Sequence, residues 1–230
     1  MRVHVAFTPA EAAAAPTGIV VDVLRATSTI CQALASGYGR VVSCAGIEEA
    51  RAVRVAEGAG LLAGERQCVR IPGFDRGNSP REFAEPGGGT VILTTTNGTR
   101  ALVAAAERCE RVFAGSLLNV AAVARAAQEA GEPVVVVCAG VLGEFAADDA
   151  YCAGRIVELL GGERSDAAEA AARLARSFAD GEEALRSSQS ARNLLAAGLE
   201  SDIAWCAREG AVTVVPRVAG TRIGAVELVA

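Results

Sequence analysis

Short runs of Val, Ile and Leu alternate along the chain with longer, Ala-rich segments. The short runs are apolar at nearly every position, which is typical of strands buried on both faces. Their alternation with helix-like segments predicts βα units and a largely parallel sheet. We expect strands at 2–7, 18–23, 40–44, 90–94, 111–114 and 133–138, and helices at 27–35, 47–57, 98–106, 119–130 and 149–160.

The last third of the chain has a different pattern. Residues 165–208 have the pattern of consecutive helices, separated by Ser, Asp and Gly positions. Residues 211–229 return to strand character and predict an antiparallel pair at the edge of the sheet, broken around 216–221. We therefore predict one α/β domain over residues 1–230, with helices flanking a largely parallel sheet and a helical insertion near 161–210.

Composition restricts the chemistry. Hydrophobic residues make up 51% of the 230 positions and aromatics only 4%, so Ala, Val and Leu must fill the core. A net charge of −5 argues against nucleic acid as the main partner. All 22 basic residues are Arg, which excludes a Schiff-base or phosphate-binding lysine. The single histidine, His4, lies in the first predicted strand, where we expect a structural role.

Cysteine usage indicates the compartment. The seven cysteines are scattered and never spaced as C-x-x-C, which predicts buried, reduced thiols in a cytoplasmic protein. The first residues lack the basic-then-apolar plan of a signal sequence, and the longest apolar runs are too short to span a bilayer. We expect a soluble chain whose partner is a small molecule rather than nucleic acid or a membrane.

Polar residues follow nearly every predicted strand. In parallel α/β sheets, ligands bind beyond the carboxyl ends of the strands, and helix N-termini at that edge suit phosphate. No one polar segment is specific by itself, but together they predict a ligand site at this edge. These segments are 20–29, 64–66, 73–80, 94–100, 115–119 and 138–149.

Asp22 and Arg25 stand at the end of the second predicted strand. A carboxylate inside a buried apolar strand is costly unless it is paired or binds a cation. Arg25 could form that pair, which would make both residues structural. Alternatively, Asp22 is a Mg²⁺ ligand and Arg25 clamps an anion, with hydroxyls from Thr27 onward opening the next helix.

Hydroxyl and amide side chains occupy two further helix starts. Thr96, Asn97 and Thr99 surround Gly98 between a strand and a helix, where they predict a neutral anion cradle. Ser79 precedes Pro80 in a typical helix start, so the Ser79 hydroxyl either caps that helix or binds substrate.

The same alternative, cap or ligand, applies to Ser116 and Asn119 after the fifth strand. Glu65 and Arg66 follow the short apolar run 61–63, a position that is usually a solvated turn. The pair Asp148-Asp149 precedes a helix; acidic residues are favoured there by the helix dipole, and they also provide the hard oxygen ligands that Mg²⁺ requires.

This inventory suits phosphoryl transfer, in which positioning and charge neutralisation dominate. Mg²⁺ held by Asp22 and the Asp148-Asp149 pair would bridge phosphoryl oxygens and could activate a water molecule, while Arg25 and Arg66 would neutralise remaining charge. The chain lacks Asp-x-Asp after its first strand and lacks G-x-x-x-x-G-K-[ST], so the haloacid dehalogenase and P-loop patterns are absent.

Taken in this order, the polar segments resemble the 2-phosphosulfolactate phosphatase family, which is known from coenzyme M biosynthesis. The resemblance runs from Val20 to about Pro216. It is carried by Val-Asp-Val-Leu-Arg-Ala-Thr at 21–27, Ala-Gly-Glu-Arg at 63–66, Gly-Phe-Asp at 73–75, Gly-Asn-Ser-Pro at 77–80, Thr-Thr-Asn-Gly-Thr at 95–99, Gly-Ser at 115–116 with Asn119, Cys-Ala-Gly at 138–140, Asp-Ile-Ala-Trp-Cys-Ala at 202–207 and Val-Pro at 215–216.

The resemblance implies Mg²⁺-dependent hydrolysis of 2-phospho-3-sulfolactate to 3-sulfolactate and phosphate, on an unusual α/β fold. One departure concerns the acidic pair, which in the family typically follows the pattern Phe-Ser-x-Glu-Asp and here is Phe-Ala-Ala-Asp-Asp at 145–149. Because Asp148 is one methylene shorter than Glu, Asp149 is the favoured ligand of the pair.

The predicted site falls into three overlapping sets. The catalytic set is Asp22, Arg25, Glu65 and Asp149, and the metal set is Asp22, Asp148 and Asp149. The substrate-binding set is Arg25, Thr27, Arg66, Asn78, Ser79, Thr96, Asn97, Gly98, Thr99, Ser116 and Asn119.

Two other functions remain open at this stage. One is a phosphatase for another small phosphorylated hydroxy acid, and the other is a non-catalytic anion-binding protein. The clustered carboxylates argue against the second, since a pure anion receptor gains nothing from negative charge unless a cation is present. The nucleophile is also open among Thr27, Ser79, Thr96 and the Asp residues, and an Ala-rich surface would suit a homodimer.

Overall fold

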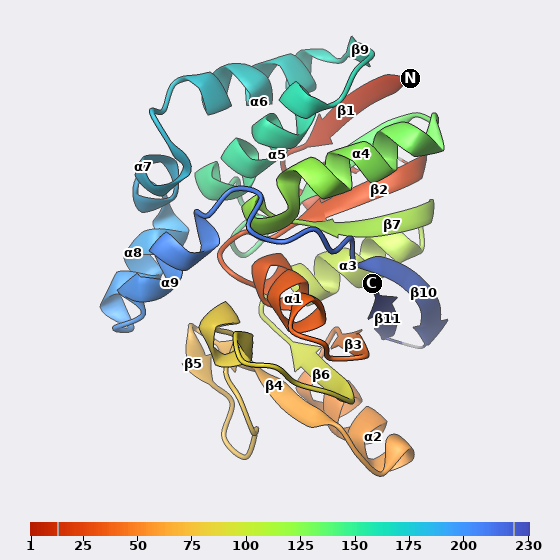
Figure 1. Cartoon of the computed structure of the whole chain (residues 1–230), viewed down its shortest axis with the longest axis vertical. Helices are drawn as coiled ribbons and strands as arrows, with labels where there is room; N and C mark the ends of the chain where they lie inside the picture. The colour runs from red at the N-terminus through yellow and green to blue at the C-terminus, as the bar shows by residue number, and fades with distance from the viewer. Residues whose placement is uncertain (13, 223) are drawn as a thin grey trace.

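The strands of the computed structural model, which describes residues 1–12, 14–222 and 224–230, join into one mixed sheet (Figure 1). Their order across the sheet is β5-β4-β6-β3-β11-β10-β7-β2-β8-β1-β9. The strands are β1 (Arg2–Ala6), β2 (Ala15–Val21), β3 (Arg40–Cys44), β4 (Leu61–Arg66), β5 (Val69–Arg70), β6 (Thr90–Thr94), β7 (Cys109–Gly115), β8 (Val134–Cys138), β9 (Glu163–Arg164), β10 (Arg217–Arg222) and β11 (Ala225–Val229).

Helices flank this sheet, so the α/β class predicted from the sequence is confirmed. The predicted bounds match those of β3, β6, α2 and α3, and most others differ by one to three residues. The helices are α1 (Ala26–Ala35), α2 (Ile47–Glu57), α3 (Gly98–Ala106), α4 (Val120–Ala130), α5 (Ala147–Leu159), α6 (Asp166–Arg176), α7 (Gly181–Arg186), α8 (Gln189–Ala196) and α9 (Glu200–Cys206), with 3₁₀ turns η1 (Pro9–Glu11), η2 (Pro80–Phe83) and η3 (Leu117–Asn119). None of these helices is long and apolar enough to cross a lipid bilayer.

An antiparallel hairpin divides the sheet into two parallel groups. Strands β4, β6 and β3 form one group, and β7, β2, β8 and β1 form the other. Between them, β11 pairs antiparallel with β3, while β10 pairs antiparallel with β11 and touches β7 through Arg217 and Phe113. The prediction of an edge pair is therefore wrong, because the hairpin lies in the interior of the sheet.

The predicted break at 216–221 is also wrong. Residues 217–222 are strand β10, and the connection between the two strands follows Arg222. Residue 223, which the predicted strand region includes, lies outside the described residues. Strand β11 is interior because Val226 and Leu228 point into a core that both parallel groups share.

Alternation along the strands builds that core on two faces. In β2, Ile19 and Val21 pack with α4, α5 and α6, whereas Val20 faces the opposite side. Val91 and Leu93 of β6 join Val20 in this second cluster, together with residues of α1 and α3. Figure 1 shows α1 and α3 lying between the two parallel groups and α2 covering the outer face of the lower group. The two groups thus share one apolar layer, which brings their carboxyl ends together.

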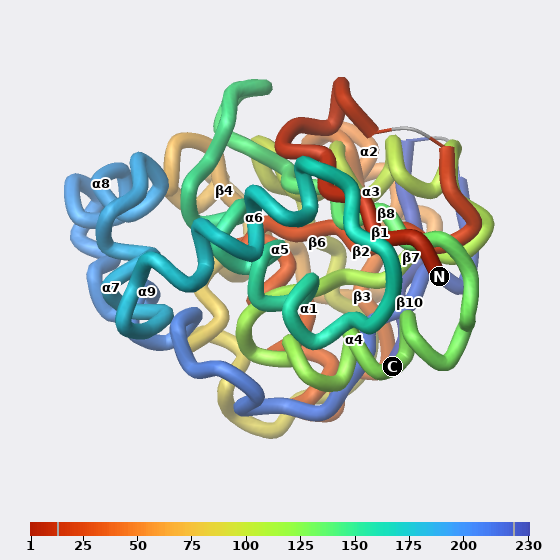
Figure 2. Tube along the Cα trace, turned by 90° about the horizontal axis from the view of Figure 1, so that it is seen from above, coloured from red at the N-terminus to blue at the C-terminus, as the bar shows by residue number. Residues whose placement is uncertain are grey.

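The helical segment α7–α9 lies at one end of the molecule, away from both chain termini (Figure 2). Helix α6 leads to it and packs closely on α5. Gly154 permits this approach, because a Cβ atom there would lie 2.1 Å from the carbonyl oxygen of Ala171. His4 of β1 bonds the Ser165 hydroxyl at 2.8 Å just before α6, a structural contact in the strand where the histidine was expected.

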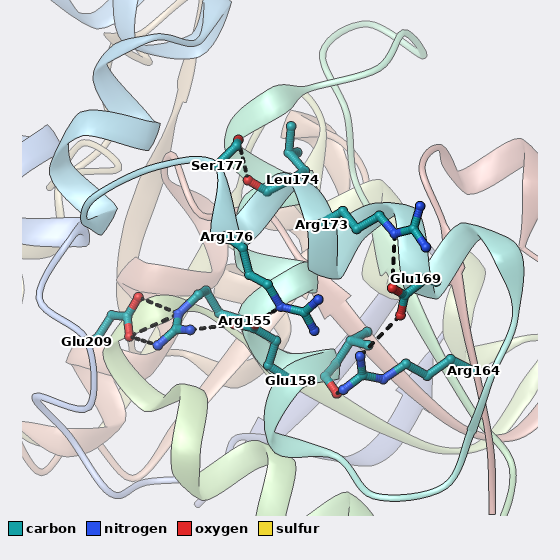
Figure 3. Close-up of polar contacts among 10 residues, drawn as sticks. Arg155, Glu158, Arg164, Glu169, Arg173, Leu174, Arg176, Ser177 and Glu209 are labelled. Carbon is teal, nitrogen blue, oxygen red and sulfur yellow. Dashed lines mark hydrogen bonds and ion pairs between the residues drawn. The ribbon is translucent and has the colours of Figure 1, made fainter.

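A network of arginines and carboxylates fastens α5 to its neighbours (Figure 3). Arg155 donates to both oxygens of Glu209, with an Nε–Oε1 distance of 3.0 Å, and Tyr151 donates its hydroxyl to the same carboxylate. Glu158 accepts from Arg155 and from Arg176 of α6. Glu209 follows α9, so the network holds the far end of the helical segment against α5.

Candidate active site

A cavity of about 340 Å³ opens where the carboxyl ends of β2, β4, β6 and β8 meet helix α8. Six of the predicted site residues line it: Asp22, Arg25, Glu65, Asn78, Thr96 and Asn97. The other lining residues are Leu24, Gln67, Cys68, Val141, Leu142, Ser190, Asn193 and Ala196.

Asp22 lies one residue beyond β2, next to the first residues of α1 and α3. Its Oδ1 atom accepts the N–H of Ala26 at 3.1 Å. A Cβ atom at position 98 would lie 2.4 Å from Asp22 Oδ2. Glycine is therefore required at 98 because the acidic side chain lies directly against the helix N-terminus.

Glu65 joins the ends of β4 and β6. Its Oε2 atom accepts the N–H of Cys68 at 2.8 Å, and its Oε1 atom accepts the N–H of Thr96 at 2.8 Å and the Thr96 hydroxyl at 3.0 Å. Thr96 belongs to the segment 94–100, predicted as an anion cradle. In the structure, part of that cradle already binds the carboxylate of Glu65.

Asp149 joins the ends of β2 and β8. Its two oxygens accept the N–H groups of Val23 at 2.9 Å and Gly140 at 3.0 Å. The neighbouring Asp148 accepts instead the hydroxyl of Ser190 on α8, at 3.0 Å. Neither acidic side chain lines the cavity, and both are buried.

Burial raises the pKa of Asp22, Asp148 and Asp149, and neighbouring negative charge adds to the rise for Asp22 and Asp149. The pKa of Asp22 is raised to about 7, first by burial and then by the charges of Asp148 and Glu65, against the opposing hydrogen bond from Ala26. Burial raises the pKa of Asp148 to about 6, although the Ser190 hydroxyl opposes the rise. Burial and the charges of Asp148 and Asp22 hold the pKa of Asp149 well above its usual range. A cation would relieve this repulsion.

Arg25 pairs with Asp202 of α9 and not with Asp22. The Nη1–Oδ2 distance is 2.7 Å, and the two side chains are 3% and 1% exposed. Ser79 donates its hydroxyl to the other oxygen of Asp202 at 2.7 Å and makes no capping bond to η2, so the capping alternative for Ser79 is wrong.

Several predicted residues lie outside the cavity. The hydroxyl of Thr27 exchanges hydrogen bonds with the backbone of Asp22, and Thr99 does the same with Thr95. Arg66 donates to the Thr94 hydroxyl at 3.1 Å, and its burial lowers its pKa.

Asn119 caps η3, since its Oδ1 atom accepts the N–H of Ser116 at 2.9 Å, so the capping alternative describes the Asn119 contact. The Ser116 hydroxyl is buried and has no hydrogen-bond partner among the described residues. The Asn119 amide also donates to the carbonyl of Val214 at 3.1 Å. These contacts fix the segment that leads into β10, at a place that does not line the cavity.

Helix α8 forms a wall of the cavity that was not predicted from the sequence. Ser190 and Asn193 reach the cavity from this helix, whose sequence shows only an N-cap signal at Ser188. Asp202 likewise had no predicted role. A buried carboxylate on the apolar face of a helix requires a partner, which is the signal that could have identified it.

The oxygen atoms at the cavity fit a Mg²⁺ ion that is bound by few protein ligands. Within the described ranges, no three His, Cys, Asp or Glu side chains are grouped to hold one metal ion. Mg²⁺ usually takes one or two carboxylates and completes its shell with water and substrate phosphate. Asn78 adds an Oδ1 atom that is buried at the cavity without a hydrogen-bond partner. Hard oxygen donors and unrelieved negative charge are what such an ion requires.

Comparison with known proteins gives a consistent result. The family model described as 2-phosphosulpholactate phosphatase matches residues 5–221. A protein of Symbiobacterium thermophilum named "Probable 2-phosphosulfolactate phosphatase" is 41% identical over 90% of this chain and 93% of its own length. Proteins with the same name from Thermus thermophilus and Deinococcus radiodurans are each 40% identical; they cover 97% and 86% of this chain, and 97% and 85% of their own lengths.

Proposed function

The chain belongs to the 2-phosphosulfolactate phosphatase family, a family of phosphoric monoester hydrolases, and we propose that it hydrolyses 2-phospho-3-sulfolactate to 3-sulfolactate and phosphate with Mg²⁺. The observation that carries the proposal is that a carboxyl group and a guanidinium cation line the same cavity. Asp22 there is a carboxyl whose pKa of about 7 reflects burial and neighbouring negative charge, and Arg25 is a cation beside it. Such a cavity suits an anion that arrives together with a metal ion.

Asp22 and Asp148 are the residues that would hold Mg²⁺, since Asp149 already uses both oxygens on backbone N–H groups. The bound ion would neutralise phosphoryl charge and polarise the phosphorus centre. Asp149 keeps the ends of β2 and β8 together through these two hydrogen bonds. Its assignment as a ligand therefore gives way, in this proposal, to a positioning role.

The rest of the cavity orients the substrate. Arg25 has five N–H donors, of which Asp202 engages one at 2.7 Å, so donors remain for a phosphoryl or sulfonate oxygen. The Asn78 amide lines the same cavity, with its Oδ1 atom unpartnered. Leu24, Val141 and Leu142 add apolar surface that excludes water around the scissile bond.

The test is phosphate release by the purified protein with Mg²⁺, comparing 2-phospho-3-sulfolactate with phospholactate and phosphoglycolate. We expect the sulfonated substrate to be strongly preferred and chelation with EDTA to abolish turnover. Asp22→Asn should lower kcat/KM by about 100-fold or more, the size of effect typical for a group that stabilises transition-state charge. Asp166→Asn, which changes an exposed carboxylate on α6, is the matched control and should leave activity unchanged.

Other outcomes would favour the alternatives. Turnover of phospholactate or phosphoglycolate without turnover of the sulfonated substrate would assign a phosphatase for another hydroxy acid. Tight phosphate binding with no turnover in the presence of Mg²⁺ would make the chain an anion receptor.

We also propose a cytoplasmic location, a role in coenzyme M biosynthesis and a homodimer. All seven cysteines are free, which suits a reducing compartment. Leu142 and Phe145, beside the cavity, are 77% and 53% exposed, so this loop offers an apolar surface to a second copy. Light scattering on the purified protein, and on Phe145→Ser, tests the homodimer: the wild type should have twice the monomer mass and the variant should dissociate.

A further inference from the structure

Asp202 of helix α9 binds two residues that are distant from it in sequence. Its Oδ2 atom accepts from Arg25 Nη1 at 2.7 Å, and its Oδ1 atom accepts from the Ser79 hydroxyl at 2.7 Å. The Asp202 side chain is 1% exposed. A carboxylate buried to this degree needs both partners, because water cannot replace them.

Arg25 has few other contacts. Its remaining protein partner among the described residues is the carbonyl of Cys68, at 3.5 Å, which is at the limit for a hydrogen bond. Arg25 is also the one basic side chain among the described residues that line the cavity. The direction of its guanidinium group is thus determined mainly by Asp202.

The helix that carries Asp202 is itself fastened to the same region. Trp205, also on α9, donates its indole N–H to Gln32 of α1 at 3.2 Å. Ser190 of the adjacent α8 donates to Asp148 at 3.0 Å. The helical segment α7–α9 therefore contacts Arg25, Asp148 and helix α1, and these contacts fix the positions of the side chains around the cavity.

We propose that Asp202 is a positioning residue, which aims the Arg25 guanidinium at the phosphoryl or sulfonate group of the substrate and ties the helical segment to catalysis. This inference rests on the proposed function, since it assigns Arg25 to the anion. Two short charge-assisted hydrogen bonds hold the Asp202 carboxylate. Because Asp202 engages only Nη1 of Arg25, the other guanidinium N–H groups remain for the substrate. Displacement of a substrate-orienting group by about 1 Å can lower the rate by about 100-fold.

The central variant is Asp202→Asn, which preserves shape and removes the charge. We expect kcat/KM to fall by about 100-fold, with most of the loss in kcat, because Arg25 remains in the cavity but is no longer directed. Inorganic phosphate, titrated by calorimetry in the presence of Mg²⁺, should bind with a changed enthalpy. Glu200→Gln is the control on the same helix: Glu200 makes an exposed pair with Arg186, and its loss should change neither quantity.

Coupling between Asp202 and Arg25 separates positioning from a purely structural role. In an Arg25→Met background, Asp202→Asn should change kcat/KM by less than about threefold, because residues that act as a unit are not additive. The double variant also removes both buried charges, so its fold does not depend on an unpaired ion. Full additivity of the two losses would overturn the proposal.

Two further results decide the remaining cases. If Asp202→Asn does not fold, Ser79→Ala is used instead, because it removes the other hydrogen-bond partner of Asp202. Ser79→Ala should lower kcat by about tenfold when Arg25 is intact and should not change kcat in the Arg25→Met background. Equal effects in both backgrounds would overturn the inference. A wild-type protein without phosphatase activity would refute the proposed function, whereas an active wild type with a fully active Asp202→Asn would refute only this inference.

Discussion

At the scale of single residues, three carboxylates hold the cavity together. Asp22, Glu65 and Asp149 each accept backbone N–H groups from loops that follow different strands. These hydrogen bonds fix the loop backbones, and Asp22 and Glu65 also present oxygen atoms to the cavity. The backbone contacts explain why acidic side chains occupy a place where they repel one another.

The raised pKa values predict how the stability of the metal-free protein depends on pH. Asp22, at about 7, and Asp148, at about 6, bind protons in the folded state at pH values where the unfolded chain has released them. Their contribution to stability is therefore largest near pH 4 and is lost as the pH rises through about 6 to 7. In EDTA, we expect Tm to fall by roughly 5 °C between about pH 5 and about pH 8.

Calorimetric scans across this range measure the effect. Mg²⁺ should raise Tm more at about pH 8 than at about pH 5, because it binds the carboxylates that have lost their protons. Asp22→Asn should make Tm in EDTA depend less on pH. Asp75 and Glu169, whose pKa values are lowered by hydrogen bonds, act below this window and do not mask it. A Tm that is constant or rises in EDTA would contradict the assignment.

Residue roles were only partly predictable from the sequence. Asp22 stood out because a carboxylate inside a buried apolar strand is costly, whereas Glu65 by itself was typical of a solvated turn; both line the cavity. The partner of Arg25 could not be deduced, since Asp202 is 177 positions away along the chain and is joined to it only by the fold. Capping and ligand binding use the same residue types, so Asn119 and Ser79 were equivalent until their contacts were known.

At the scale of elements, α5 and α6 illustrate how closely the helical segment is attached. Gly154 places the backbones of the two helices in contact, and the arginine–carboxylate network of Figure 3 lies along the same surface. Most of these ion pairs are partly exposed and contribute little individually. Close backbone packing is therefore the stronger attachment.

Gly154→Ala tests this attachment. A methyl group there would meet the carbonyl of Ala171 at 2.1 Å and the Cβ atom of Ala175 at 2.8 Å, so the helices must separate. We expect the free energy of unfolding to fall by about 1–3 kcal/mol, measured by urea denaturation. Gly88→Ala, where the added methyl group has no neighbour within 4 Å, should change it by less than about 0.5 kcal/mol. Equal changes in both variants would show that this contact does not constrain the helices.

Element type and bounds were well predicted because they depend on local periodicity and capping. The continuous run at 134–138 and the Gly that follows 120–130 are local signals of this kind. The position of a strand within the sheet is not local. The segment 225–229 has the same alternation at an edge or in the interior, and only its pairing with β3 distinguishes them. Prediction of an edge hairpin failed for that reason.

At the scale of the whole molecule, one apolar layer joins the two parallel groups. It contains Val20 and Val137 from one group, Val91 and Leu93 from the other, and Leu228 from the hairpin between them. The cavity forms where both groups end, so its geometry depends on this layer even though none of these residues lines it.

Leu228→Ala should disturb this junction. The side chain is fully buried, so we expect a loss of roughly 2–5 kcal/mol in the free energy of unfolding, followed by urea denaturation. Val229→Ala, one residue further on and half-buried, is the control and should cost about 1 kcal/mol or less. If the two variants lose equal stability, the hairpin is not part of a shared core.

The position of the hairpin in the chain has a consequence for synthesis. Residues 217–229 follow every other described element, yet they fill the centre of the sheet. While a nascent chain is still emerging from the ribosome, the sides of β3 and β7 that later pair with the hairpin carry unpaired N–H and C=O groups. A ribosome stalled before codon 217 would therefore display two open edges, each a template for association with another chain.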